Sequence, residues 1–501
     1  MSGRRPWLRM GVLGRNIASN LAARSIASLL SLLFIPLYVR ILGIEAWGLI
    51  GFSLMLQSIF AIFDFGLGLT LNRELARRRG PDGAAEAGDL VRTYEAVSWI
   101  FAAVASLVVI AASGWIATNW IRSGTLAPET LERAIRLMGV MFGLQIPFWL
   151  YQGGLFGLER HFALNVITTA TVAVRHGGAA LVLLFVAPTI ETYFGWLIVA
   201  TGLQTALTGG PLWRSIRRPF FGSRFRAGLL ARSGSFTAAV SVNGVFAPLV
   251  TQIDKIILSA LVPLEDFGVY TLAWSLAAAL WMLVAPVTTA LFPRFARLVE
   301  DRNEEELAAL YHRVTRALAV VLAPAAMLLI TFPQAIVLLW SGDAAVAERA
   351  QAVLPFLAAG TMLAGLATVP LTLQMAAGKP RLVLYTNVAA ICVLTPATLI
   401  LGRQFGIPGV AALWAAVGLG YVLAMTPIMH RGLLRRHYGR WLGRDVALPV
   451  AAAAIATIPW RFASPLGGSA SAIPVLAAAW LVALVLCVLL SGNPLRALAR
   501  S

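Results

Sequence analysis

The stretch SLLFIPLYVRILGIEAWGLIGFSLMLQSIFAIFDFGLGLTLNRELARR, which runs from Ser31 to Arg78, decides the fold of this chain. It contains the end of one long apolar run and the whole of a second, and it closes on a cluster of arginines. About 20 apolar residues of helix cross the roughly 30 Å hydrocarbon core of a bilayer, and the runs lack the alternation of a β-barrel strand. The stretch therefore predicts two membrane-spanning helices, near 17–41 and 46–72.

The same pattern extends over the whole chain of 501 residues. Hydrophobic residues make up 59% and charged residues 12%, compared with about 45–50% and about 25% in soluble domains. The apolar excess is spread along the chain, which excludes a soluble enzyme with one anchor. We expect an all-α integral membrane protein with about 14 transmembrane helices, or with twelve and a loosely attached last pair. The spans lie near 17–41, 46–72, 93–118, 133–156, 163–187, 191–212, 234–260, 267–292, 314–340, 350–376, 382–402, 406–429, 446–461 and 472–491.

The positions of the charged residues predict the topology. The chain has 40 Lys and Arg against 22 Asp and Glu, a formal net charge of +18. Most of these cations fall on one side of the membrane when the N-terminus is placed inside, as the positive-inside rule predicts. We therefore expect both termini to be cytoplasmic and see no need for a nucleic-acid partner. The two cysteines lie in apolar runs and the five histidines are scattered, so we expect no disulfide framework and no metal site.

A repeated motif predicts two similar halves. The pattern of Glu, any residue, aromatic residue and Gly occurs at 45–48 and again at 265–268, an offset of 220 residues. The offset is nearly kept by NRELARR at 72–78 and PRFARL at 293–298. Such matches favour a parallel repeat of two six-helix bundles. The expected organisation is an N-terminal bundle at 1–212, a basic linker at 213–233, a C-terminal bundle at 234–430 and two extra helices at 431–501.

Two segments outside the spans have a pattern of their own. The linker 213–233 interleaves arginines with aromatic and aliphatic residues, so it predicts an interfacial segment on anionic headgroups. The alternative is an ordinary basic loop. The segment 303–312, NEEELAALYH, predicts a short surface helix with acids in its first turn, where the helix dipole favours them.

Charged residues inside spans indicate function, because each costs roughly 2.5–3.5 kcal/mol at mid-membrane on insertion scales. Arg175 lies at the centre of the span 163–187, and Thr171 precedes it by four residues on the same helix face. A cation on a polar stripe suits an anionic group of a substrate. The alternative is a structural arginine bonded to neighbouring carbonyls or to a carboxylate. His176 lies elsewhere on the helix, and we expect it to be a packed polar residue.

The first two spans contain a second polar face. Asn20 and Arg24 belong to a stripe along the first span that includes Ser28 and Ser31, which predicts contact with a water-filled cavity or plain interhelical hydrogen bonds. Asp64, in the second span, has a depth that matches Arg24. We expect the two to form a pair, either a structural salt bridge or one that opens when a proton or phosphate arrives.

Further polar faces occur in the fourth and seventh spans. Gln145 and Trp149 share a face on which the indole ring could stack on a sugar, although a packing aromatic is the plainer interpretation. Asp254 and Lys255 are adjacent near the outer end of the seventh span, so we expect that they do not face one another and that Lys255 extends toward the interface. No loop is long enough for an active site, which favours a transporter over an enzyme.

The stretch Ser31–Arg78, together with TQIDKIILSALVPLEDFGVYTLAWSL at Thr251–Leu276, resembles the Wzx-type polysaccharide and O-antigen flippases of the multidrug/oligosaccharidyl-lipid/polysaccharide exporter superfamily. The resemblance covers about the first 430 residues. It implies two six-helix bundles in a V around a central cationic cavity, with two extra C-terminal helices. It also implies a bacterial inner-membrane location.

The resemblance further implies a substrate and roles for residues. The substrate would be an undecaprenyl-pyrophosphate oligosaccharide, moved to the outer leaflet for O-antigen, capsule or exopolysaccharide assembly, with the polysaccharide polymerase machinery as a further partner. No cofactor is implied; a proton or sodium gradient or the membrane potential would supply the energy. Candidate substrate-binding residues are Arg175, Arg24, Asn20, Thr171, Lys255, Gln145 and Trp149. Candidate coupling-ion residues are Asp64 and Asp254.

Other functions remain open at the level of sequence. Within the superfamily, a multidrug cation antiporter would need a cavity rich in acids, whereas this sequence places arginines there. A lipid II flippase would also have fourteen spans and a cationic cavity. A membrane polysaccharide polymerase or glycosyltransferase would show a long outside loop with catalytic polar groups, and none is evident.

Overall fold

A computed structural model describes residues 12–61, 66–78, 84–216, 222–231, 251–378, 380–463 and 469–492, without the side chains of 12–25, 84–85, 380–387, 463 and 469–471. These residues form helices and connecting turns, apart from one isolated bridge between Arg122 and Pro263. The all-α fold class is therefore confirmed. The chain forms two compact units, Met1–Glu265 and Asp266–Ser501. The expected boundaries at 212 and 233 lie before this division, and the four-part organisation stays a prediction.

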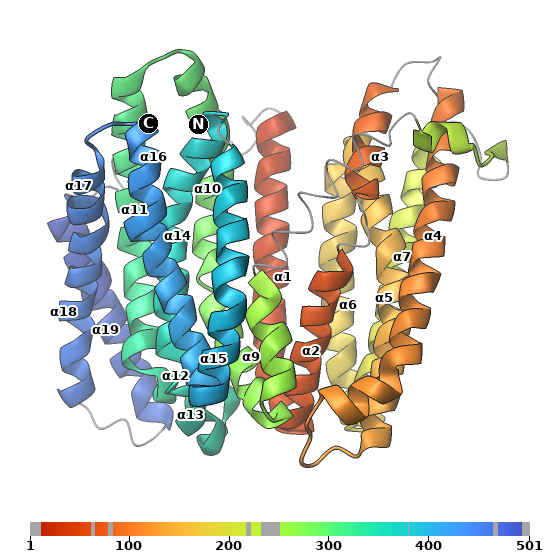
Figure 1. The fold of residues 1–501 in the computed structure, drawn as a ribbon, viewed down its shortest axis with the longest axis horizontal. Coiled ribbons are helices and arrows are strands. Elements are labelled where there is room, and N and C mark those ends of the chain that lie inside the picture. Colours follow the sequence, from red (N-terminus) through yellow and green to blue (C-terminus); the bar gives the residue numbers. More distant parts are fainter. Residues whose placement is uncertain are drawn as a thin grey trace, which may run out of the picture. The chain divides into compact units, whose positions relative to one another are not determined.

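Unit 1 contains the helices coloured from red to yellow in Figure 1. In chain order these are α1 (Val12–Leu42), α2 (Ile44–Phe60), α3 (Leu67–Arg77), α4 (Ala84–Trp115) with a π-helical end η4 (Ile116–Trp120), α5 (Pro128–Gly157), α6 (His161–Phe185) and α7 (Ile190–Ser215). A further helical segment covers 251–261. The helix α5 packs against α3, α4 and α7, and α6 packs against α1 and α7. The central position of α5 explains why 72% of its apolar window is buried.

Glycines on α5 allow α3 to approach it closely. A Cβ atom built on Gly153 would lie 2.1 Å from the backbone oxygen of Gly68, and one on Gly157 would lie 2.5 Å from that of Asn72. Only hydrogen fits at these positions, so the two backbones touch directly. The sequence GGLFG at the end of α5 thus fixes the distance between α3 and α5.

Unit 2 contains the helices coloured from green to blue in Figure 1. They are α9 (Leu264–Ala278), α10 (Trp281–Glu300), α11 (Glu304–Thr331), α12 (Pro333–Ser341), α13 (Ala344–Ala350), α14 (Leu354–Ala376), α15 (Pro380–Gly420), η6 (Tyr421–Met425), α16 (Thr426–Gly432), α17 (Tyr438–Arg440), η7 (Trp441–Ala447), α18 (Leu448–Ala463) and α19 (Ser469–Leu490). Because α9 begins two residues before the division, its first turn belongs to unit 1. The helix α11 packs against α10, α14, α18 and α19.

A buried polar cluster joins α11 to the last helices of unit 2. Asp445, which is fully buried, accepts hydrogen bonds from Arg316 Nη2 at 2.7 Å and Nε at 3.1 Å and also pairs with His312. The other ring nitrogen of His312 lies 2.8 Å from His437 Nδ1. Since a carboxylate only accepts, His312 Nδ1 carries a proton toward Asp445, and in the neutral ring Nε2 accepts from His437. These contacts compensate the negative charge of Asp445, whose burial without partners would cost free energy.

The described residues contain nine helices that are long and apolar enough to cross a membrane, and two shorter apolar ones at Ile26–Leu42 and Ile44–Phe60. Large apolar side chains are exposed along them; Leu107 on α4, for example, is 65% exposed. Exposed apolar helices are stable in hydrocarbon because a helix satisfies its own backbone groups. The chain is therefore a multi-pass membrane protein, and the count of fourteen spans stays a prediction.

Several expected elements differ in detail from the observed ones. The expected span 267–292 is interrupted by a turn at 279–280, where α9 ends and α10 follows. The expected spans 382–402 and 406–429 are joined in α15 through a kink at Gly406, whose φ of 60° suits glycine. The helix expected at 303–312, with acids in its first turn, is observed, but the expectation that it is short is wrong. It is the start of the 28-residue α11, and Asn303 caps it by accepting from the backbone of Glu306.

Candidate functional site

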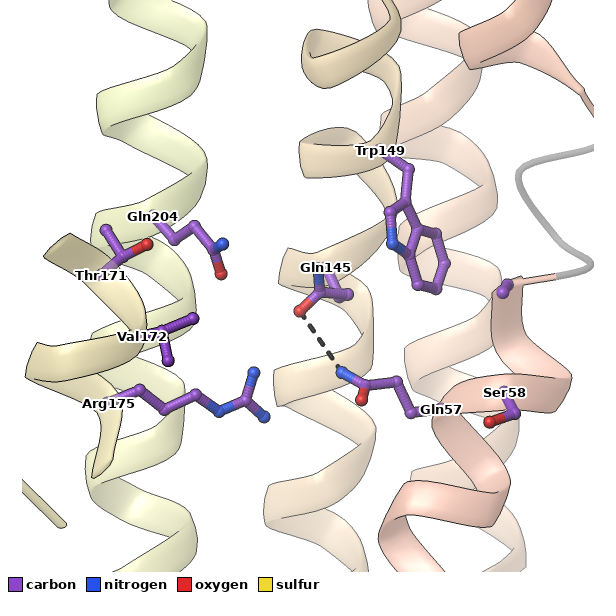
Figure 2. A pocket seen from close by; sticks show the side chains of 9 residues that line it. Gln57, Ser58, Gln145, Trp149, Thr171, Val172, Arg175 and Gln204 are labelled. Carbon is purple, nitrogen blue, oxygen red and sulfur yellow. Dashed lines mark hydrogen bonds between the residues drawn. The ribbon is translucent and has the colours of Figure 1, made fainter. Parts of the chain in front are cut away.

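A cavity of about 360 Å³ lies within unit 1, between four helices. Figure 2 shows its side chains converging from α2, α5, α6 and α7. Its lining is mostly polar and carries one cation. The lining residues are Gln57, Ser58, Ala61, Gln145, Trp149, Thr171, Val172, Arg175 and Gln204. None of these described lining residues has a carboxylate, so the cavity presents positive charge, amides and hydroxyls.

Arg175 supplies the charge. Its side chain extends from α6 into the cavity, toward the amides of Gln57 and Gln145 (Figure 2). Its Nη2 atom lies 3.8 Å from the sulfur of Met141, a weak acceptor. Within the part of the chain that the structure describes, no carboxylate forms an ion pair with it. The charge of a guanidinium inside a membrane protein is costly without a partner, and anionic groups such as carboxylate and phosphate match its bidentate geometry.

Three glutamines surround the guanidinium. Gln57 donates to Gln145 across the cavity at 3.5 Å, a long hydrogen bond, and Gln204 faces the same space from α7. Gln145 and Gln204 are almost fully buried. An amide both donates and accepts, so these side chains match the hydroxyl groups of a sugar. Trp149 lines the cavity beside them and offers an apolar ring surface.

The neighbouring residue, His176, fixes α6 against α1. Its Nε2 atom lies 2.9 Å from the hydroxyl of Ser31, and the hydroxyl of Tyr38 donates to its backbone oxygen at 2.9 Å. The imidazole also stacks against Phe34 at 6.0 Å between ring centroids. These contacts fit the expectation that His176 is a packed polar residue. These contacts hold this turn of α6 against α1, and Arg175 extends from the same turn into the cavity.

The structure brings four predicted site residues together: Arg175, Thr171, Gln145 and Trp149 all line the cavity. The hydroxyl of Thr171 bonds back to the oxygen of Ile167 at 2.8 Å within its own helix. The roles of these four residues in binding stay predictions. Sequence reasoning missed Gln57, Ser58 and Gln204. A signal was present, because Gln57 and Gln204 are amides inside otherwise apolar runs.

The other predicted residues lie elsewhere or outside the described part of the chain. Asp64 and the side chains of Asn20 and Arg24 fall outside the described residues, so their expected pairing is untested. The expectation that Asp254 and Lys255 do not face one another is wrong. The Lys255 ammonium lies 3.2 Å from an Asp254 carboxylate oxygen and 3.2 Å from the Thr251 carbonyl. The flexible four-carbon stem of lysine allows its ammonium group to bend back toward the neighbouring residue.

The fold has clear relatives among solved structures. The structure described as "Lipid II flippase MurJ, inward closed conformation" matches with a TM-score of 0.71 at 10% identity, covering 93% of this chain and 97% of that one. An inward-facing multidrug resistance MATE family transporter of the MOP superfamily matches with a TM-score of 0.65 at 13% identity, covering 81% and 96%. At these identities the likeness shows the fold alone. The fold is that of a class of membrane transporters.

Sequence comparisons identify the family. The family model described as "Polysaccharide biosynthesis protein" matches residues 13–299, and the MatE model matches 240–400. A Shigella flexneri protein named "Putative O-antigen transporter" is 20% identical over 404 residues, which are 80% of this chain and 94% of the relative. This chain belongs to the polysaccharide biosynthesis protein family. The family consists of transporters and flippases, so the chain is a membrane transporter and not an enzyme.

Proposed function

We propose that this protein is a flippase that moves undecaprenyl-pyrophosphate-linked oligosaccharide repeat units from the cytoplasmic to the periplasmic leaflet. One observation carries the proposal: the guanidinium of Arg175 enters a polar cavity among membrane helices without a carboxylate partner among the described residues. A pyrophosphate linking a lipid to a sugar has the charge and the oxygen geometry that an arginine binds best. The similarity to an O-antigen transporter supports the same class of substrate.

The remaining lining residues fit the sugar part of this substrate. Gln57, Gln145 and Gln204 provide donors and acceptors for hydroxyl groups, and Trp149 provides a face for a sugar ring. These groups are uncharged and adaptable, so they suit a polar oligosaccharide of several compositions. A binding site of this kind separates the two tasks: Arg175 holds the anionic linkage, and the amides and indole hold the glycan.

The charge of the cavity argues against a multidrug cation antiporter. A site for organic cations needs carboxylates, and the described lining has none while it has Arg175. A lipid II flippase is the nearest alternative, because its substrate also has a lipid-linked pyrophosphate. The mass of the accumulated substrate distinguishes the two.

The proposal includes a location and a cycle. The protein resides in the bacterial inner membrane with both termini cytoplasmic, as its arginine distribution predicts. Transport occurs by alternating access, in which the cavity opens first to one side of the membrane and then to the other. A proton or sodium gradient or the membrane potential supplies the energy, and no cofactor takes part. The product feeds O-antigen, capsule or exopolysaccharide assembly by the polymerase machinery.

The test uses a strain that lacks the gene. Undecaprenyl-linked lipids are extracted and analysed by mass spectrometry, and surface polysaccharide is quantified. We expect a complete repeat unit to accumulate while surface polysaccharide is lost. Persistent polysaccharide with increased sensitivity to cationic drugs would instead indicate an antiporter, and accumulation of lipid II would indicate the peptidoglycan precursor.

Complementation with variants then tests the site. Arg175→Ala should abolish export at normal protein level, whereas Arg175→Lys should retain part of it because the charge remains without the bidentate geometry. The matched control is Arg136→Ala, which removes an arginine whose side chain is 55% exposed and pairs with Glu132 on its own helix. Normal export by Arg175→Ala would remove the basis of the proposed site.

A further inference from the structure

A second cavity of unit 1 has a different chemistry from the first. It has a volume of about 290 Å³ and lies between α4, α5 and α7, which Figure 1 shows within unit 1. Its lining is mostly small or aromatic, with one acid. The lining residues are Glu95, Trp99, Leu144, Tyr151, Gly202, Thr205, Ala206, Gly209, Gly210 and Trp213. We refer to it as the α4–α7 groove.

The helices α5 and α7 separate this groove from the Arg175 cavity. On α5, Leu144 lines the groove while the next residue, Gln145, lines the Arg175 cavity. On α7, Thr205 lines the groove while Gln204 lines the Arg175 cavity. The hydroxyl of Thr205 donates to the Leu144 oxygen at 2.8 Å and closes the wall between them. The groove is therefore a site of its own.

The open side of the groove faces the same way as lipid-exposed residues. Ala206 and Gly210 line it and are exposed, and they alternate along α7 with Leu203 and Leu207, which are 42% and 44% exposed. From Gly202 to Trp213 the groove extends about 16 Å along the helix, roughly half of the 30 Å hydrocarbon core. These dimensions match a single hydrocarbon chain from one leaflet.

At the polar end of the groove, the carboxylate of Glu95 is compensated by neighbouring side chains of the same unit. The Glu95 carboxylate accepts from the Tyr151 hydroxyl at 2.5 Å and from the Trp213 indole nitrogen at 3.3 Å. Its other oxygen pairs with Arg92 at 3.1 Å. Glu95 is 5% exposed, so its charge is buried and compensated. The two aromatic side chains that it holds, a tyrosine and a tryptophan, are of the types enriched at membrane interfaces.

A basic segment, 224–226, is hydrogen-bonded to α4 next to this end of the groove. The backbone nitrogens of Arg224 and Arg226 donate to Asp89 at 2.8 Å and to Thr93 at 2.9 Å on α4, and Arg226 Nε pairs with Asp89 at 2.8 Å. The segment is held mainly by its backbone. The side chains of Arg224 and Phe225 are therefore left exposed, and Arg226 is 57% exposed.

The charges at this end leave a net positive surface. Arg92 pairs with Glu95 and Arg226 pairs with Asp89, and the exposed side chain of Arg224 adds a further positive charge. The anchored segment belongs to the expected linker 213–233, on the cytoplasmic side of the predicted topology. Arginines near that surface attract anionic lipid headgroups.

We propose that the α4–α7 groove binds an anionic phospholipid of the cytoplasmic leaflet. One acyl chain lies along the small residues of α7, and the phosphate meets the arginines of the anchored segment. The wall of α5 and α7 lies between the groove and the Arg175 cavity, and this separation favours a resident phospholipid over the transported lipid. The inference goes beyond the proposed function and stands without it.

Native mass spectrometry of the detergent-purified protein tests the groove. The protein is titrated with phosphatidylglycerol and, separately, with phosphatidylcholine. We expect one phosphatidylglycerol to be retained in preference to phosphatidylcholine. Gly210→Leu fills the groove, since a Cβ at Gly210 meets nothing within 4 Å, and it should abolish the retained lipid. Gly195→Leu is the matched control on the same helix, with equally open space and no part in the groove.

The headgroup contact has its own variant. Arg224→Gln keeps the backbone hydrogen bond to Asp89 and removes one exposed charge, so the preference for phosphatidylglycerol should fall roughly fivefold, as expected for one arginine near a lipid surface. Arg431→Gln, an exposed residue of unit 2, should leave the preference unchanged. Equal retention of both lipids by the unmodified protein, or unchanged retention in Gly210→Leu, would overturn the proposal.

A competition experiment identifies the source of the phosphate. Undecaprenyl phosphate is added to the protein already loaded with phosphatidylglycerol. Retention of the phosphatidylglycerol supports a resident phospholipid. Its displacement at equal or lower concentration, lost in Gly210→Leu, would assign the groove to the polyprenyl lipid and overturn the proposal.

Discussion

The hydroxyl of Tyr38 on α1 donates to the backbone oxygen of His176 on α6 at 2.9 Å, one residue from the arginine that enters the polar cavity. Tyr38 is 1% exposed, and its ring meets that of Tyr193 on α7 edge to face at 5.2 Å. A single buried side chain thus joins three helices at the level of Arg175. The position of the guanidinium depends on this contact between helices as well as on α6 itself.

Tyr38→Phe tests this dependence. The variant removes the hydrogen bond and keeps the ring, so we expect normal insertion and roughly fivefold lower export, the equivalent of a net loss of about 1 kcal/mol. Export is measured as surface polysaccharide in the complemented deletion strain. The effect should shrink when Arg175 is already lysine, because Tyr38 acts through the arginine. An undiminished loss in Arg175→Lys would contradict this positioning role.

Gln145→Leu tests the sugar-binding role of the amides. The substitution keeps the size of the side chain and removes its hydrogen-bonding groups, so export should fall by roughly 5- to 150-fold, as expected for losing about 1–3 kcal/mol of polar contact. Gln57→Leu should have a similar effect, and the two losses should not add because the residues share a hydrogen bond. Export is quantified at matched protein levels. Full export by both single variants would exclude the glutamines from binding.

Gly153→Ala tests the close approach of α3 and α5. The added methyl group would overlap the Gly68 backbone oxygen, so the helices must separate, and we expect a loss of about 1–3 kcal/mol in the free energy of unfolding. Thermal unfolding of the purified protein provides the measurement. Gly195→Ala is the control, because nothing lies within 4 Å of its Cβ position and alanine favours the helix. A midpoint for Gly153→Ala as high as that of the control would refute the contact.

The His312–His437 pair predicts a pH dependence of stability. Burial and the nearby His312 and Arg440 lower the pKa of His437, while Glu304 opposes them. A histidine whose pKa is lower in the folded state takes up protons more readily when unfolded. Stability is therefore full above about pH 6.5, the ordinary pKa of histidine, and is lost as the pH falls below it toward the lowered value.

The measurement compares unfolding midpoints between pH 7.5 and pH 5. His437→Gln should reduce the slope, because the glutamine cannot take up a proton, whereas His161→Gln in unit 1 should leave it unchanged. The charged groups that surround His437 come from α11, α17 and η7, so the effect belongs to this junction. A slope that is identical in all three proteins would show that His437 does not contribute to the pH dependence.

The repeated motif shows what a local pattern can predict. The helices α2 and α9 begin at Ile44 and Leu264, which differ by the same 220 residues as the two motifs. The partners of the motif come from other segments. Glu45 of the first copy accepts from the backbone nitrogens of Gly124 and Thr125, and Asp266, which follows the Glu of the second copy, pairs with Arg349. The pattern predicts where a helix starts, and the partner depends on the loop that folds back onto it.

Arg175 and Thr171 could be placed on one helix face from their spacing alone, because helical periodicity is a property of the chain itself. Their meeting with Gln57 and Gln204 could not be predicted, since it depends on how α2 and α7 pack around α6. The pairing of Lys255 with Asp254 was missed for a similar reason: spacing describes where side chains leave the helix, and a long side chain can return to its neighbour.

By itself, the sequence determined that this is a multi-pass helical membrane protein. Long apolar runs leave only the helix as a way to satisfy backbone groups in hydrocarbon, and the match to the polysaccharide biosynthesis family follows from the order of residues. The tertiary structure alone decided which polar side chains share a cavity and which lie behind the wall of α5 and α7. That choice rests on contacts between distant segments, such as Tyr38 with His176 and Gly153 with Gly68, whose energies depend on close packing rather than on any local pattern.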